Sequence, residues 1–96
     1  MIRVEGERLY VSGPATLATA AQLIDAARGP LAAGVNAIDL GEVTELDSSL
    51  LAVLFAWLRA AKLRQRPLAL QRLPPDLKSL AQLYGVAELL PEDSAS

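Results

Sequence analysis

Residues 38–51 read IDLGEVTELDSSLL, and this stretch decides the fold together with the apolar run that follows it. Its first residues predict a short hydrophobic strand that ends in a polar connection. Asp47, Ser48 and Ser49 then offer alternative N-caps, because their side-chain oxygens can accept hydrogen bonds from the free N–H groups of a first helical turn. The helix that they open carries no charge before Arg59. Because a small domain leaves much of its surface in water, such an apolar helix predicts a partner that covers part of it.

The composition predicts one domain that stays in the cytoplasm. The chain has 96 residues, which leaves no room for a second core, and we assign residues 1–90 to the domain and 91–96 to a disordered polar tail. Hydrophobic residues make up 52% of the chain, yet the longest apolar run, Leu50–Leu58, is far shorter than the roughly 20 residues of a membrane-spanning helix. Charged residues within Met1–Glu5 stand where a signal peptide would have its apolar segment.

The residue types that are missing from the chain exclude several classes of functional site. The chain has no cysteine and no histidine, which excludes disulfides, thiolate metal sites and the commonest general base. Its formal net charge of −2 is atypical of a nucleic-acid-binding domain. Four basic residues cluster late in the central helix and are interpreted as a solvated helix end that suits the helix dipole: Arg59, Lys62, Arg64 and Arg66. The sequence therefore predicts a binding protein with no catalytic residue, no metal, no cofactor and no nucleic-acid partner.

Turn and cap signals divide the rest of the chain. Gly6-Glu7-Arg8 separates two weakly alternating strands, which predicts a hairpin, and Gly29-Pro30 is typical of a helix end. Pro74-Pro75 can open a last helix without losing a hydrogen bond, and Gly85 suits its left-handed cap. The predicted elements are strands 2–5 and 9–12, a helix from Thr16 to Gly29-Pro30, a buried strand 35–40, the central helix, a strand 67–73, a helix 74–84 and a short edge strand 87–90. This order predicts a single α/β domain, with a mixed sheet of four to five strands and helices packed mainly on one face.

Acidic residues gather around the end of the strand 35–40, where α/β sheets often bind ligands. They are Asp39, Glu42, Glu45 and Asp47. One interpretation is a divalent-metal or acid–base site, and the other is a solvated loop with a helix cap. No further acidic or basic group is placed in the sequence to complete such a site, so the second interpretation is favoured.

Ser48 and Ser49 are the other polar pair of interest. Neither can act as an activated nucleophile, because no histidine exists and no lysine is near in sequence. Both can cap the helix, and a hydroxyl at a helix N-terminus is also a good place for phosphorylation, since the added charge meets the positive end of the dipole. Spacing alone does not separate these interpretations.

The central helix has two apolar faces, and we expect only one of them to face the sheet. The first face consists of Leu50, Val53, Trp57 and Ala60, and the second of Leu51, Leu54, Phe55 and Leu58. The second set is wider and better matched to a core stripe, which predicts that Trp57 lies on the outer side. The alternative is that Trp57 packs against a neighbouring helix.

One stretch of the sequence resembles a known family. It consists of a strand and a polar segment, followed by Asp47-Ser48-Ser49-Leu50-Leu51. Ile38-Asp39-Leu40 followed by residues 43–51 is similar to the strand, loop and Asp-Ser-x-Gly-Leu helix start of the STAS domain family (sulfate transporters and anti-sigma-factor antagonists). The resemblance covers nearly the whole chain, and it implies a STAS-like fold and a binding module. Residues 80–86, LAQLYGV, resemble the end of the third helix in the small cytoplasmic STAS subunit, often called MlaB, of the Mla-type phospholipid ABC transporter.

The motif departs from the family at one position and leaves two candidate hydroxyls. Leu50 stands where the family usually has glycine, which suggests a more apolar contact with the partner. In the transporter branch, the residue after the motif aspartate carries a hydroxyl and lies against the ATPase subunit, and that position is Ser48 here. In the antagonist branch the phosphorylated serine is one further on, at Ser49. Leu50, the apolar helix and the Leu83-Tyr84 pair together favour the transporter branch.

The resemblance thus implies a non-catalytic cytoplasmic subunit that binds and supports the ATPase of a phospholipid ABC transporter. Such a subunit helps to maintain membrane lipid asymmetry and is peripheral to the inner membrane through the complex, with no direct insertion. The alternative is an anti-sigma-factor antagonist that is regulated by phosphorylation at Ser49 and binds a kinase-type anti-sigma factor. The residues expected to contact the partner are Asp47, Ser48, Ser49, Leu50, Val53, Trp57 and Tyr84.

Overall fold

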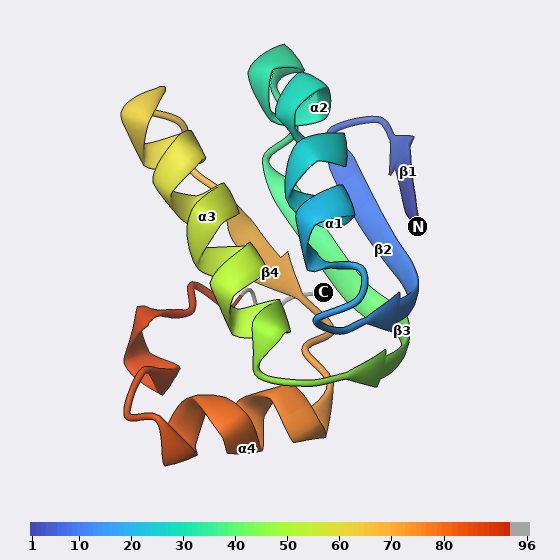
Figure 1. The fold of residues 1–96 in the computed structure, drawn as a ribbon. Helices are drawn as coiled ribbons and strands as arrows, with labels where there is room; N and C mark the ends of the chain where they lie inside the picture. The colour runs from blue at the N-terminus through green and yellow to red at the C-terminus, as the bar shows by residue number, and fades with distance from the viewer. Residues whose placement is uncertain (93–96) are drawn as a thin grey trace.

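Four strands form one mixed sheet in the computed structural model, which describes residues 1–92 (Figure 1). β1 (Ile2–Glu5) and β2 (Arg8–Ala15) pair antiparallel across a tight turn. β3 (Ala37–Leu46) and β4 (Ala69–Gln71) run parallel to β2, and the strand order is β1-β2-β3-β4. The structure confirms the hairpin, the inner position of the third strand and the mixed sheet that the sequence predicts.

The helices lie mainly over one face of this sheet. α1 (Ala20–Ala26), α2 (Arg28–Ala33) and α3 (Ser49–Leu63) cover that face, as Figure 1 shows. α4 (Pro75–Leu83) runs below the start of α3 in the same view, and a short 3-10 helix, η1 (Ala87–Leu89), follows it. This arrangement is the predicted α/β fold.

The core lies between the sheet and the helices that cover it. Leu9 and Val11 of β2 and Ile38 and Leu40 of β3 are fully buried, because alternate side chains of a strand point to the same face. The central helix adds the buried residues Leu50, Leu51, Val53, Leu54, Trp57 and Ala61. Neither α3 nor any other helix in the described part of the chain has the length and apolar character needed to cross a membrane.

β3 is longer than the strand predicted over residues 35–40. Residues 41–46, interpreted from sequence as a polar connection, pair in parallel with β2. Val43 and Leu46 are partly buried against the core, and this apolar surface keeps the segment in the sheet although polar residues surround it. β2 is longer as well. Gly13-Pro14, predicted to end it, lies inside it at a register shift, where the missing N–H of proline interrupts no regular ladder.

The first helical segment is two helices instead of the single one predicted. Gly29-Pro30 does not end a helix but lies in the first turn of α2, where proline loses no intrahelical hydrogen bond. α2 ends at Gly34, whose φ of 111° lies in the left-handed region that favours glycine. Leu17, within the predicted helix, precedes α1 and is 77% exposed.

α4 forms as predicted at both of its ends. Leu77 and Ala81 are fully buried, and Gly85 has a φ of 70°, the left-handed conformation expected after the last turn. Tyr84 follows the last turn, and its side chain is 57% exposed.

The edge of β4 is covered differently from the prediction. The edge strand predicted over residues 87–90 is the helix η1, and no ladder forms there. Instead the Leu70 N–H donates a 2.9 Å hydrogen bond to the Pro91 carbonyl, so the chain after η1 reaches the edge of the sheet. Glu92 pairs with Lys78 at 3.0 Å. Residues 93–96 of the predicted tail lie outside the described residues.

Candidate functional site

Asp47 organises the junction between β3 and α3. Its Oδ1 accepts a 2.8 Å hydrogen bond from the N–H of Ser49, which caps the first turn of α3. Its Oδ2 accepts a 3.0 Å bond from the N–H of Leu17, which ties the loop after β2 to the same helix start. The N–H groups of Leu17 and Ser49, together with the Ser49 hydroxyl, hold the pKa of the Asp47 carboxyl below its ordinary value. Of the three predicted caps, Asp47 therefore takes the role.

The two serines differ in what their hydroxyls can do. Ser48 stands at the N-cap position, is exposed and makes no side-chain capping bond in the described chain. Ser49 is partly buried, its N–H donates to the Asp47 carboxylate, and its hydroxyl contributes to the lowered pKa of that carboxyl. Because Asp47 already caps the helix, the Ser48 hydroxyl can meet another molecule without loss of the cap.

The prediction that Leu50, Val53 and Trp57 face outward is wrong. Leu50 is fully buried, Val53 is 1% exposed and Trp57 is 2% exposed. The reason is that α3 is covered on two sides, by the sheet beneath it and by α1 and α2 beside it, so that two apolar faces enter the core. These three side chains cannot form a surface for a partner in this fold.

The outward line of α3 consists of other residues. Ser48, Ala52, Phe55 and Arg59 follow one another at helical spacing, and all four are exposed or partly exposed. Sequence analysis missed Ala52 and Phe55 as surface residues. The signal that could have found them is Arg59, the first charge in the helix, because a charged side chain marks the solvent face and residues three to four earlier share it.

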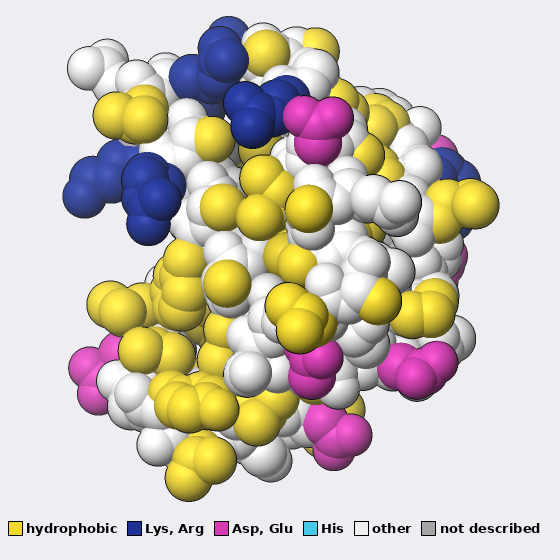
Figure 2. Space-filling model, in the orientation of Figure 1, with side chains coloured by type: hydrophobic (Ala, Val, Ile, Leu, Met, Phe, Trp, Pro, Cys, Tyr) yellow, Lys and Arg dark blue, Asp and Glu magenta, His cyan; other side chains and the backbone are white. Residues whose placement is uncertain are grey.

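Several large apolar side chains near α3 are exposed. Leu17 lies beside the helix start through its bond to Asp47, and Leu83, Tyr84 and Leu89 lie at the end of α4 and on η1. Figure 2 shows hydrophobic side chains gathered around a hollow where α3 meets α4 and η1. Tyr84 follows the last residue of α4, so it comes from a different element than the Asp47–Ser49 junction at the start of α3. Such a patch is typical of a protein-binding surface.

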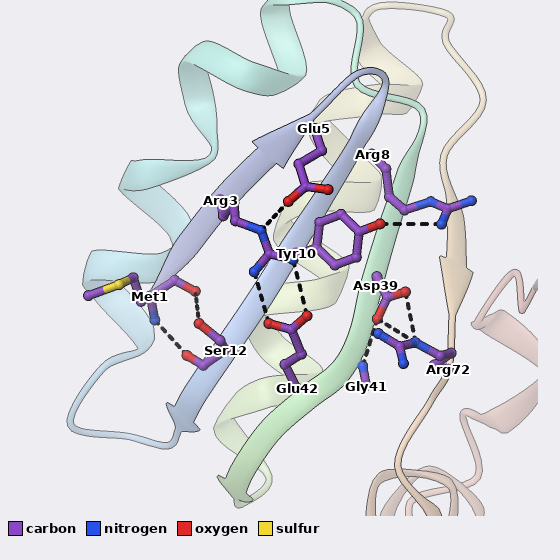
Figure 3. A network of polar contacts seen from close by, with 10 residues as sticks. All are labelled: Met1, Arg3, Glu5, Arg8, Tyr10, Ser12, Asp39, Gly41, Glu42 and Arg72. Carbon is purple, nitrogen blue, oxygen red and sulfur yellow. Dashed lines mark hydrogen bonds and ion pairs between the residues drawn. The ribbon is translucent and has the colours of Figure 1, made fainter.

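The acids predicted to cluster with Asp47 lie elsewhere. Asp39 is 3% exposed, and both of its carboxylate oxygens accept hydrogen bonds from Arg72 Nε, at 3.0 and 2.9 Å. Glu42 accepts bonds of 2.9 and 3.1 Å from Arg3, and these bonds lower the pKa of Glu42. Figure 3 shows these pairs on the sheet face that the helices leave uncovered. Each of these two acids is neutralised by its own arginine.

This arrangement makes the acidic residues structural. The remaining predicted acid, Glu45, is exposed on β3. Within residues 1–92 no group of three or more acidic, histidine or cysteine side chains is arranged to hold a metal ion. The start of α3 thus offers another molecule the exposed Ser48 hydroxyl and nearby apolar side chains.

Comparison with known proteins agrees with this architecture. The family model described as "Mlab, STAS domain" matches residues 2–91. A crystal structure described as an anti-sigma factor antagonist from Thermotoga maritima superposes with a TM-score of 0.75 at 16% identity, over 98% of this chain and 86% of that one. The anti-sigma factor antagonist SpoIIAA in its unphosphorylated form gives a TM-score of 0.65 at 12% identity, over 86% of this chain and 81% of that one. No curated protein matches the chain by sequence.

Proposed function

The chain belongs to the STAS domain family, and from this premise we propose that it is a non-catalytic subunit that binds and supports the ATPase of a phospholipid ABC transporter. The observation that carries the proposal is the difference in exposure and contacts between the two serines. Ser48, which corresponds to the hydroxyl of the transporter branch, is exposed and free of the capping role. Ser49, which corresponds to the phosphorylated serine of the antagonist branch, is partly buried against Asp47.

The proposed contact replaces the one expected from sequence. We define the α3 docking surface as Leu17, Ser48, Ala52 and Phe55, with Tyr84 as an outlying contact. An aromatic side chain within an apolar patch is a common hot spot of protein interfaces, and Phe55 takes this role in place of Trp57. A subunit that binds the ATPase only in its competent conformation stabilises that conformation by mass action, which supports ATP hydrolysis without a catalytic residue.

The test is co-purification of the chain with the ATPase subunit of a phospholipid ABC transporter from the same organism. Ser48→Arg should abolish co-purification and leave the melting temperature unchanged, because Ser48 is exposed and an unpaired charge would become desolvated in the interface. Leu63→Arg is the matched control, since Leu63 is 81% exposed on the same helix and lies outside the α3 docking surface. It should bind as the parent does. Undiminished binding by both Ser48→Arg and Phe55→Ala would reject the proposed surface.

The alternative function is an anti-sigma-factor antagonist that is switched at Ser49. The motif offers a serine at that position, and this alone favours it. A phosphate on Ser49 would lie beside the Asp47 carboxylate, whose lowered pKa keeps it charged. The two neighbouring negative charges would repel each other. Intact-mass measurement of protein from its own host, with a Ser49→Ala complementation test, separates the functions. A stoichiometric phosphate together with an inactive but folded Ser49→Ala variant would replace the transporter proposal.

A further inference from the structure

A groove of about 350 Å³ runs between α3 and the pair α1 and α2. Its apolar lining consists of Ile24, Leu31, Ala56, Trp57 and Ala60. The groove exists because Ala56 and Ala60, one helical turn apart, are too small to fill the space between the helices. Its volume and mainly apolar lining are those of small-ligand sites. None of these residues belongs to the α3 docking surface.

The polar groups at one end of the groove are cationic. Arg28 and Arg64 line the groove there, and Figure 2 shows basic side chains bordering hydrophobic ones over α2 and the end of α3. Arg28 pairs with Asp25 at 3.1 Å in an exposed contact that water screens strongly. Arg64 forms no ion pair among the described residues. This end of the groove therefore favours an anion.

Trp57 contributes a second observation. Its side chain is 2% exposed, and its indole N–H has no hydrogen-bond partner in the described part of the chain. A buried Tyr or Trp usually finds a partner for its polar atom, because leaving one unmet costs free energy. The groove thus has an apolar lining and cations at one end, and one of its lining residues carries a buried donor without an acceptor.

The length of the groove suits an extended chain. From Ala56 to Arg64 the groove follows α3 for about 12 Å, at 1.5 Å per residue. A hydrocarbon chain can lie along its apolar lining while an anionic head group reaches the arginines at its end.

We propose that this groove binds a single-chain anionic amphiphile, a carboxylate with one unbranched hydrocarbon chain. The carboxylate lies between Arg28 and Arg64, and the chain lies along Ile24, Ala56 and Ala60 over the Trp57 ring. The proposal does not depend on the transporter function.

Trp57 is the only tryptophan in the chain, so its fluorescence reports directly on this groove. Decanoate, added below its micelle-forming concentration, should change the emission saturably and raise the melting temperature. Decanol and decylamine are matched neutral and cationic probes and should bind at least tenfold more weakly. Arg64→Gln and Arg28→Gln should each weaken decanoate binding by up to about fivefold, as expected for partly exposed ion pairs. Arg59→Gln, a charge change on the same helix outside the groove, should have no effect.

Filling the groove is the second arm of the test. Ala60→Phe should abolish decanoate binding, and Ala56→Leu serves the same purpose should the first variant fail to fold. The absence of a saturable change with decanoate overturns the proposal. Equal binding of decanol and decanoate overturns it as well, since the arginines would then select nothing. If decanoate does not bind and folded Ala60→Phe loses the ATPase while Ser48→Arg retains it, the groove belongs to a protein segment.

Discussion

Replacement of Trp57 by alanine tests which face of α3 is buried. Trp57 is 2% exposed and packs in the core cluster, so its removal should cost about 3–5 kcal/mol of unfolding free energy. A chain of 96 residues has a total stability of about 5–14 kcal/mol at 0.05–0.15 kcal/mol per residue. The substitution thus removes a third or more of the stability over most of this range. The Tm should fall by at least about 12 °C, since 1 kcal/mol corresponds to roughly 4–8 °C at this size.

Trp57→Phe distinguishes the contribution of the aromatic ring to stability from that of the indole N–H. Phenylalanine keeps most of the apolar contact and removes the donor that has no partner, so the cost should stay below about 1.5 kcal/mol. Urea unfolding followed by far-UV circular dichroism is the suitable assay, because both variants lack the only tryptophan. Leu63→Ala, at a position 81% exposed on the same helix, is the control and should shift stability by less than about 0.5 kcal/mol. A Trp57→Ala midpoint within the range of the control would refute the burial of this face.

Two further predictions concern the polar contacts. A Cβ at Gly41 would lie 2.5 Å from Arg72 Cζ, so Gly41→Ala should displace Arg72 from buried Asp39 and lower stability. In an Arg72→Ala background the same change should have little further effect, and a double-mutant cycle in urea checks this. The folded pKa of Asp47 is lowered, so its stabilisation is present above the ordinary aspartate pKa and is lost as the pH falls through the folded pKa. The stability gap between the parent and Asp47→Asn should therefore close at low pH, and a gap that does not change with pH would contradict the capping role.

The sequence predicts most of the fold because its strongest signals are local. The hairpin turn at Gly6, the opening of the last helix by Pro74-Pro75 and its left-handed end at Gly85 each follow from the conformation that one residue type allows. The order of elements follows from these boundaries, and the family resemblance rests on the same stretch around Asp47. Signals of this kind do not depend on what packs over the helices.

The predictions from sequence are wrong where tertiary contacts determine the local structure. Both sides of α3 are apolar in sequence, and only the presence of α1 and α2 beside it shows that two faces are covered. Gly29-Pro30 can end a helix or begin one, and the choice depends on where the next segment must run. Arg72 is distant from Asp39 in sequence and reaches it across the Cα of Gly41, which no local pattern reveals. The sequence thus groups the Asp39 carboxylate with Asp47, from which the fold separates it.

The rigidity of α3 bears on how a partner would be bound. Its two apolar faces fix its position, and Asp47 links its first turn to the loop that carries Leu17. The backbone segments that carry Ser48 and Leu17 are therefore held together before any partner arrives. Association loses less entropy when the contact residues are already ordered, so a small surface can suffice. Since Asp47 supplies that order from beneath the surface, Asp47→Asn should weaken partner binding without removing an interface side chain, whereas Ser48→Arg acts on the interface itself.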